Sequence, residues 1–401
     1  MFVGGGLVTF ARAPSVIVHP QLWAEDGAVF FQSAYNQGWH GPLLEAQAGY
    51  LQTFSRLIAD VGLLTPLAWV PALFAGAALA VQVLPAVLVA SRRFARAVPD
   101  RRVRLLLAAA YLAVPNSSEV NVDLTNAQWH LAVLAVLVVL ALPATGAWRV
   151  FDIGVIVCSG LTGPFVLSLV VIAALVYHRR RQAWTVVLGA ISVAAASVQI
   201  FEILTSRRPP VGPLGATAPR LVEMLGGRLI GTTLLGTSTS TSTWFTGHLL
   251  ASSTILVIGA VLVVIFAVWS GPFELKMFNL WAALVLAGSL VSPLASSHGL
   301  QWPNLIGDPG GRYWLFPSLA LLADLIWVAG QYRSRRIVAV GALLVLLSVA
   351  VFGVREDFRY PTITAPSWPA QVHRFDRAAA GSSFVFEIRP PGWTMTLHQK
   401  H

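Results

Sequence analysis

The sequence predicts an all-α polytopic membrane protein with about eleven transmembrane helices. Of its 401 residues, 56% are hydrophobic and 11% are charged, and the mean hydropathy is +0.70, which is more apolar side chain than a soluble core can hide. Apolar runs recur between Pro, Gly and Arg residues, as in a chain that crosses a bilayer repeatedly. The arginines form short clusters between these runs, so the net charge of +10 indicates topology rather than nucleic-acid binding.

Several of the expected spans are shorter than the ~20 residues that a full crossing needs. The first run lacks a basic n-region and a clean cleavage site, so we expect a retained anchor. Two short runs meet at "GLTGPF" and are expected to be half-depth helices that leave a cavity at the outer side. The expected spans are 1–18, 65–90, 104–115, 129–143, 151–163, 164–178, 183–205, 248–269, 277–293, 313–331 and 336–354.

The arginine clusters also predict which loops lie inside. With a cytoplasmic N-terminus, the inner loops hold about half of all Lys and Arg residues, which is the expected positive-inside bias. We therefore expect a multi-pass cell-membrane protein with an extracytoplasmic C-terminus. The alanine- and arginine-rich composition is associated with GC-rich bacteria, which would place the outer loops in the periplasm or cell-wall space. The inner loops are 91–104, 144–150, 178–182, 270–276 and 331–336.

Two parts are expected, a transmembrane domain over 1–354 and a small extracytoplasmic segment over 355–401. The tail contains "FVFEI" and then "TMTL", which predicts a strand pair that is too short to be stable without packing on the membrane part. Cys158 has no partner cysteine, which excludes disulfides and thiolate metal sites. The outer loops of the first part are 19–64, 116–128, 206–247 and 294–312.

Three segments of the outer loops have predicted structure of their own. Helical spacing of apolar residues in the first loop predicts an amphipathic helix that lies on the membrane. A second interfacial helix is expected over 219–235, and the Ser/Thr run 236–247 is expected to be a mobile loop. The apolar residues of the first helix are Leu44, Ala48, Leu51, Phe54 and Ile58.

Acidic residues cluster in two successive outer loops. Glu25 and Asp26 precede a helix-compatible stretch, where the helix dipole would stabilise their carboxylates. Capping and surface charge would account for this pair equally well. Glu119 and Asp123 fall in the second loop, "PNSSEVNVDLTNAQWH", among several amides. The clustering favours a polar site.

A third element, "GDPGGRYWLFP" at 307–317, places Arg312 and Tyr313 at the start of a late span. An arginine at that depth is costly unless it meets a carboxylate, a carbonyl or a ligand phosphate, or reaches the headgroups. The sequence contains no metal-ligand spacing, phosphate-cradling glycine loop or nucleophile elbow.

In their order these elements resemble the GT-C-type membrane glycosyltransferases, the superfamily that includes protein mannosyltransferases and lipid A aminoarabinose transferases. The likeness covers nearly the whole chain as architecture and rests on "WAEDG…Y", "GLTGPF" and "GRYWLFP" as motifs. The first-loop motif of that family is commonly an Asp-Glu pair with the aspartate at the reaction centre, whereas the order here is Glu25-Asp26. By position we favour Asp26 as the base, and Glu25 stays open as the alternative.

The resemblance implies an inverting glycosyltransferase that moves a hexosyl or pentosyl group from a polyprenyl-phosphate donor to an acceptor hydroxyl at the extracytoplasmic side. It also implies that Arg312 and Tyr313 help to hold the donor phosphate. The chemistry fits independently, because the transfer needs a carboxylate to take the acceptor proton and a cation to stabilise the leaving phosphate. The expected partners are the lipid-linked donor, membrane lipid and a glycan, lipid or protein acceptor.

No cofactor is required by this chemistry. A divalent metal is not indicated, although Glu25, Asp26 and Asp123 would chelate one if they converged. The acceptor is expected to contact the second outer loop, where an acid or Asn126 would orient it and Trp129 would stack on a sugar ring. Taken alone, Trp129 is also typical of an interfacial belt, and the adjacent His130 of a satisfied residue at the mouth of a span.

Other functions share some of these features. A polytopic transporter or a lipid or glycolipid flippase also has many spans and a polar cavity, but would more naturally place ionisable groups near the bilayer midplane, often with an internal repeat. A polysaccharide polymerase or ligase also uses lipid-linked donors, normally pyrophosphate-linked ones, with a large basic outer loop. A non-catalytic membrane scaffold is the remaining alternative.

Overall fold

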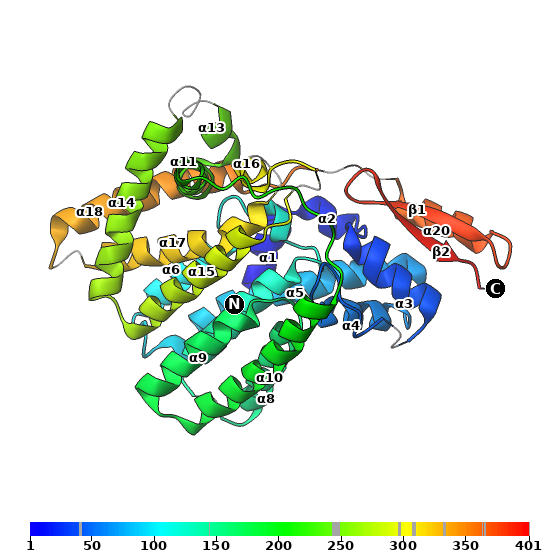
Figure 1. Ribbon diagram of the computed structural model, residues 1–401, viewed down its shortest axis with the longest axis horizontal. Helices are drawn as coiled ribbons and strands as arrows, with labels where there is room; N and C mark the ends of the chain where they lie inside the picture. Colours follow the sequence, from blue (N-terminus) through cyan, green and yellow to red (C-terminus); the bar gives the residue numbers. More distant parts are fainter. Residues whose placement is uncertain are drawn as a thin grey trace.

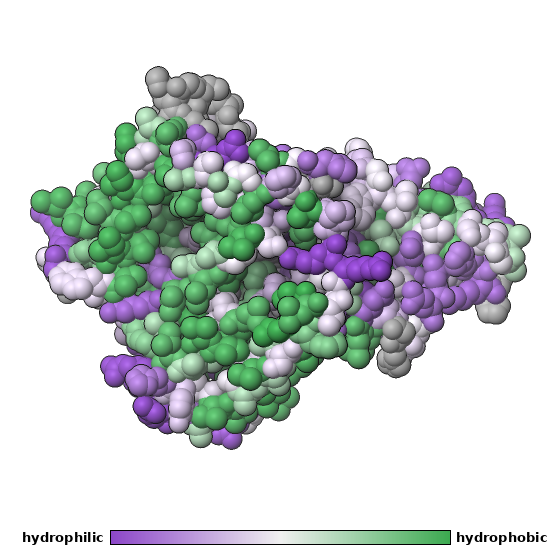
Figure 2. All heavy atoms as spheres, viewed as in Figure 1, coloured by the Kyte–Doolittle hydropathy of each residue, from purple (hydrophilic) through white to green (hydrophobic). Residues whose placement is uncertain are grey.

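The described part of the chain is a helical bundle with a two-stranded sheet near its C-terminus (Figure 1). Figure 2 shows hydrophobic surface over the bundle and hydrophilic surface over the end that carries the C-terminal helix and strands. This distribution agrees with an all-α membrane protein. The computed structural model describes residues 1–39, 42–143, 145–242, 249–295, 298–306, 310–331, 334–362, 364 and 366–400.

Every expected span contains a helix. By length and composition, six helices among the described residues are able to cross a membrane: Leu67–Ala90, Ala183–Thr205, Leu250–Ser270, Phe273–Val291, Gly311–Gly330 and Arg336–Asp357. The helices in the expected spans are α1 (Phe2–Arg12) with α2 (Pro14–Val18), α5 (Val70–Ala90), α6 (Arg101–Leu112), α7 (Ala127–Leu140), α8 (Ala147–Gly160), α9 (Val166–Arg180), α10 (Ala183–Thr205), α14 (Leu249–Ser270), α15 (Phe273–Val291), α17 (Leu315–Gly330), and α18 (Arg336–Ser348) with η7 (Val349–Val354).

The last of these helices runs past the expected domain boundary at 354, because α19 (Arg355–Asp357) continues it. The other short helices connect or flank the spans. They are η1 (Asp26–Phe31), α3 (Gln32–Gln37), α4 (Thr53–Gly62), η2 (Leu67–Trp69), η3 (Arg92–Phe94), η4 (Ser118–Val120), α11 (Ala218–Glu223), η5 (Met224–Gly231), α12 (Thr232–Leu235), α13 (Thr237–Ser242), α16 (Gln301–Ile306), η6 (Gly311–Trp314) and α20 (Trp368–Asp376).

Helices α8 and α9 are short, as the apolar runs predict. They contain 14 and 15 residues, which is ~21 to 23 Å at 1.5 Å per residue, against a hydrocarbon thickness of ~30 Å. The turn between them pairs with the chain before α4, where Gly163 N–H donates to the Leu51 carbonyl at 3.0 Å. These lengths agree with helices that reach only part of the way across a bilayer.

The loops expected inside and the loops expected outside lie at opposite ends of α6 and α7. The loops before α6, α8, α10 and α15 meet at one end, which we call the arginine-rich end. There, Arg93 pairs with Asp152 through two hydrogen bonds of 2.7 and 2.8 Å, and Arg180 pairs with Glu274 at 2.7 Å. The loops that contain the acids meet at the other end, which we call the acidic end. This grouping is what an alternating topology predicts.

The amphipathic helix expected from residue 44 is wrong in its start, because α4 begins at Thr53. Ala48 and Gly49 have φ of 54° and 90°, and left-handed residues cannot continue a right-handed helix. The expected helix over 219–235 is confirmed by α11, η5 and α12. The expected loop over 236–247 instead begins with the helix α13, and its residues 243–247 lie outside the described residues.

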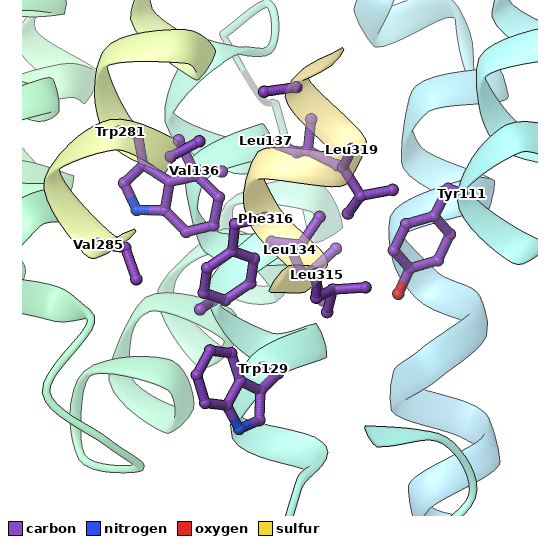
Figure 3. Close-up of a cluster of buried hydrophobic side chains, with 14 of the residues drawn as sticks. Tyr111, Trp129, Leu134, Val136, Leu137, Trp281, Val285, Leu315, Phe316 and Leu319 are labelled. Atoms are coloured by element: carbon purple, nitrogen blue, oxygen red, sulfur yellow. The ribbon is translucent and has the colours of Figure 1, made fainter. Parts of the chain in front are cut away.

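Aromatic side chains form the centre of the core beneath the acidic end. Phe316 of α17 lies between Trp129 of α7 and Trp281 of α15, with ring centroids 5.1 and 4.6 Å away (Figure 3). Phe165 contacts Trp129 from another side, at 4.7 Å. Large buried rings dominate packing energetics, and this cluster fixes the start of α7 against that of α17.

Arg12 ties the first helix to this scaffold. Its side chain is buried and donates hydrogen bonds to the Leu112 and Val114 carbonyls at 2.6 and 3.0 Å and to the Ser117 hydroxyl at 3.2 Å. It also donates to the Asp357 carbonyl, at the end of the last candidate span. The guanidinium of this charged residue in the first apolar run therefore has hydrogen-bond acceptors from two other segments of the chain.

We expect Arg12→Met to lower the free energy of unfolding by about 3 kcal/mol, because several charge-assisted hydrogen bonds are lost and buried carbonyls stay unpaired. Thermal melting of the purified variant in detergent measures the effect. Arg102→Met, at an exposed position, is the matched control, with an expected change within about 0.5 kcal/mol. Equal melting of both variants would show that Arg12 is not a structural anchor.

The strand pair predicted in the tail is present. β1 (Ser383–Ile388) and β2 (Trp393–His398) pair antiparallel. The pair packs on η1 and α3, where Asn36 donates to the Thr396 carbonyl at 2.9 Å. Just before η1, Ala24 N–H donates to the Arg389 carbonyl at 2.5 Å. The tail therefore supports the turn that carries Glu25 and Asp26.

Candidate functional site

The segment between α6 and α7, residues 116–126, is polar, is buried except at Ser118 and Glu119, and forms the centre of the acidic end. Gln82 of α5 holds it from below, donating to Asn121 at 2.7 Å and accepting from Val122 N–H at 3.2 Å. Val122 has φ of 60°, which is a true outlier for a β-branched residue. Such strain persists only where surrounding contacts impose it, and it is common at functional sites.

Asp26, in the first turn of η1, binds this segment directly. Its carboxylate accepts the Thr125 hydroxyl at 2.6 Å and Leu124 N–H at 3.1 Å. Burial raises the pKa of Asp26 from 3.8 to about 7, although these two hydrogen bonds oppose the shift. A carboxylate with a pKa near neutrality is suited to act as a general base.

Asp123 is the electrostatic neighbour of Asp26. Burial raises its pKa well above the ordinary value, and the negative charge of Asp26 adds to this shift. One of its oxygens accepts Asn126 N–H at 2.8 Å. The Asn126 amide donates in turn to the Glu119 carbonyl at 2.8 Å, so Asn126 shapes the loop. Burial and the charge of Asp26 thus both favour the neutral form of Asp123.

Glu25 lies at the same site with a different environment. It is half-buried, and within the described parts of the chain its carboxylate has no hydrogen bond or ion pair. Its charge interacts with both Asp26 and Tyr50. The two adjacent acids therefore differ, since Asp26 is fixed and buried while Glu25 is more accessible.

Arg312 meets Glu119, which is 193 residues away in the sequence. The guanidinium and the carboxylate form an ion pair, Arg312 N–H donates to the same carboxylate at 3.0 Å, and the guanidinium also donates to the Leu294 carbonyl at 2.8 Å. A Cβ at Gly311 would lie 3.3 Å from Glu119, so a glycine eases this approach. Both charged side chains are 25% exposed, which leaves Arg312 open to a ligand.

The remaining predicted residues lie around this pair. The Tyr313 hydroxyl accepts Leu294 N–H at 2.9 Å, and its ring lies 5.7 Å from that of Trp129. The Trp129 ring is enclosed by aromatic neighbours, which leaves little of its face for a sugar. His130 uses both ring nitrogens within the protein, towards Tyr111 at 2.7 Å and the Val120 carbonyl at 2.8 Å. The site therefore centres on the acids and Arg312.

Three residues to which the sequence assigns no role of their own also lie at the site. Gln128 donates to the Tyr50 hydroxyl at 3.4 Å, and burial raises the pKa of Tyr50, so this hydroxyl stays protonated. The charge of Arg312 also acts on Tyr50. Gly163, with φ of 107°, lies so close that a Cβ there would be 2.5 Å from the Gln128 amide oxygen. The turn of "GLTGPF", where the sequence predicts a cavity at the outer side, thus forms one wall of the site.

Two polar atoms at this wall point to a ligand. The amide oxygen of Gln128 and the indole N–H of Trp129 are buried, and within the described residues neither has a hydrogen-bond partner. The same holds for the side-chain amide nitrogen of Asn116. Buried polar atoms without partners are costly, and a bound polar molecule would satisfy them.

We expect Gly163→Ala to lower the turnover of the site about tenfold, because a left-handed alanine is strained and its methyl group displaces Gln128 and Tyr50. Initial rates of the sugar transfer expected from the sequence, together with a melting curve, measure both effects. Gly154→Ala in α8 meets no atom within 4 Å and is the control, with an unchanged rate expected. Equal rates for the two variants would remove the turn from the site.

No group of three or more His, Cys, Asp and Glu side chains within the described residues is arranged to hold a metal ion. Glu25, Asp26 and Asp123 thus do not form such a group. Comparisons with family models, curated proteins and solved structures find no match for this chain. The function must therefore be argued from the chemistry of the acidic end.

Proposed function

We propose that the protein is an inverting glycosyltransferase that moves a sugar from a polyprenyl-phosphate donor to an acceptor hydroxyl at the extracytoplasmic side of the membrane. The observation that carries this proposal is the convergence of Asp26, Asp123 and the Glu119–Arg312 pair at one end of a membrane-embedded bundle. A base and a cation at the membrane surface fit a donor that carries its own lipid.

In the proposed reaction, the Asp26 carboxylate takes the proton of the acceptor hydroxyl. The hydroxyl oxygen then forms a bond to the anomeric carbon, while the bond from that carbon to the phosphate oxygen breaks. The products are the glycosylated acceptor, protonated Asp26 and polyprenyl phosphate. A pKa of about 7 for Asp26 supports the role, because a base titrating near the working pH balances ionisation against proton affinity.

Arg312 is proposed to stabilise the phosphate that leaves. The phosphate is already anionic, so one cation and hydrogen-bond donors suffice, and no acid is needed to protonate it. Glu119 and the Leu294 carbonyl orient the guanidinium, and its exposed part is free to receive a phosphate oxygen. The Tyr313 hydroxyl accepts a backbone N–H but keeps its own proton for donation.

The burial of Asp26 means that this mechanism requires a movement of the protein. Asp26 is 2% exposed, so an acceptor hydroxyl reaches it only after the loops around it separate. Acceptor binding is therefore proposed to be coupled to movement of the segment 116–126 or of the tail. Glu25 needs no such movement, and it is the alternative base that the experiments must separate from Asp26.

Transport is the second candidate, and one observation favours it. Asp324 is buried in α17, accepts the Asn279 amide at 2.8 Å, and has a second oxygen without a partner among the described residues. An ionisable residue within a span is typical of a proton or ion pathway.

Proteoliposomes that contain the purified protein separate the two functions. With a labelled polyprenyl-phosphate sugar and an acceptor extract, a transferase should label the acceptor with the inverted anomeric configuration, and Asp324→Asn should leave that transfer unchanged. Movement of the intact donor across the bilayer without transfer, abolished by Asp324→Asn, would instead establish a transporter or flippase.

A further inference from the structure

Two cavities lie side by side at the arginine-rich end, opposite the acidic site. The first is almost wholly apolar, has a volume of about 390 Å³, and lies among α5, α6, α7, α15 and α17. The second is polar and has a volume of about 300 Å³. Both are lined by Glu274 at the start of α15. The residues that line the polar cavity are Arg96, Arg179, Arg180, Gln182, Phe273 and Glu274.

The polar cavity carries an excess of positive charge, with three arginines against one glutamate. Arg180 is satisfied, since it donates to Glu274 and to the Leu140 carbonyl, each at 2.7 Å. Arg96 and Arg179 have no hydrogen bond or ion pair within the residues that the structure describes. Two guanidinium groups therefore line one cavity without an anionic partner of their own, and phosphate and carboxylate are the anions that their planar donors fit.

The loop that carries Arg96 is held in place on both sides. Arg93 forms two hydrogen bonds to Asp152 of α8, and Arg104 donates to the Val98 carbonyl at 2.7 Å. These contacts fix the loop between α5 and α6 against the neighbouring helices. The backbone that carries Arg96 is therefore held at the cavity.

The apolar cavity shares Glu274 with the polar one and lies among the helices of the bundle. On α6 it is lined by Val103, Leu107 and Tyr111, four residues apart, which is a stripe of about 12 Å along one face of the helix. Ala323 and Trp327 line it from α17. An apolar cavity of this kind fits a hydrocarbon chain, whereas a free ion would not enter it because it would lose its hydration there.

We propose that the two cavities together bind one anionic phospholipid, with its phosphate among Arg96, Arg179 and Arg180 and an acyl chain in the apolar cavity. Basic pockets between helices at the positively charged side of membrane proteins recognise such headgroups. Free phosphate shares the chemistry of the headgroup but would leave the apolar cavity unfilled. The site does not depend on the glycosyltransferase proposal, because it lies at the other end of the bundle.

Native mass spectrometry of the purified protein with phosphatidylglycerol or phosphatidylcholine of identical acyl chains tests the site. Wild type should retain phosphatidylglycerol in preference. The double variant Arg96→Gln/Arg179→Gln should bind it roughly 25-fold more weakly, at about fivefold per arginine. Both positions are exposed, so the variant should fold. Arg101→Gln/Arg102→Gln removes two charges from the same end outside both cavities and should change the affinity less than about twofold.

A third variant separates lipid from free phosphate. Ala323→Phe narrows the apolar cavity and should weaken phosphatidylglycerol binding about tenfold, with binding of inorganic phosphate unchanged. Equal retention of phosphatidylglycerol by wild type and Arg96→Gln/Arg179→Gln would overturn the proposal. Two results together would show that the site binds phosphate and not a lipid. Inorganic phosphate would displace phosphatidylglycerol at a concentration similar to that of the lipid, and Ala323→Phe would leave phosphatidylglycerol binding unchanged.

Discussion

Asp26→Asn is expected to keep the fold and to lower turnover by ~10²–10⁴, the usual contribution of a general base. The amide oxygen can still accept Leu124 N–H, and the Thr125 hydroxyl can rotate to accept from the new NH₂ group. Initial rates of sugar transfer and a melting curve measure the two effects. Glu25→Gln removes the neighbouring charge and is the matched control, with an expected loss below about tenfold. A larger loss of turnover in Glu25→Gln than in Asp26→Asn would instead identify Glu25 as the base.

The pH dependence of the proposed transfer has a defined direction. The base must be ionised, so the wild-type rate should rise with pH through about 7, the pKa of Asp26, and then level off. A raised pKa in the folded state means that the folded protein binds the proton more tightly than the unfolded chain. Ionisation of Asp26 therefore lowers stability as pH rises from about 4 to about 7. Asp26→Asn lacks this loss and should be at least as stable as wild type at pH 8.

Arg312→Ala is expected to lower kcat/KM for the donor by ~10²–10³, the range for losing one preorganised group that stabilises a developing anion. Arg312→Lys keeps the charge and should recover about tenfold of this loss, but not all, because lysine cannot match the fixed geometry of the guanidinium. Steady-state kinetics against donor concentration measures both variants.

Glu119→Gln provides the control for the Arg312 variants, because it removes the partner but keeps the cation. Its expected loss is below about tenfold, since the Leu294 carbonyl still holds the guanidinium. If Arg312→Ala used the donor as well as Glu119→Gln does, Arg312 would be a structural residue that pairs with Glu119 and nothing more.

The positions of the helices were predictable because the signal is local. A run of apolar residues such as 183–205 predicts its own helix, whatever it packs against. The strand pair was predictable for the same reason, from the alternation around Phe384 and Phe386. The start of α4 was not, because left-handed backbone at Ala48 and Gly49 interrupts a pattern whose apolar spacing runs through it.

The acidic site was predictable only as a set of residue types. Asp26 meets Thr125 across 99 residues, and Glu119 meets Arg312 across 193; no single-sequence spacing encodes such pairings. Arg12 is another case, because its carbonyl partners come from two distant segments. Tyr50 has no distinguishing neighbours in the sequence, and only the folded turn at Gly163 brings Gln128 to it.

Release of polyprenyl phosphate tests the central claim most directly. A panel of synthetic polyprenyl-phosphate sugars is incubated with purified wild type or Asp26→Asn, with a crude membrane extract as the source of acceptor. If the acidic end is the transferase site, wild type should release polyprenyl phosphate from one of the donors. Asp26→Asn should release it at least about a hundredfold more slowly. Equal release by both proteins would contradict the role of Asp26, and no release from any donor, with the intact donor crossing the bilayer, would contradict transfer itself.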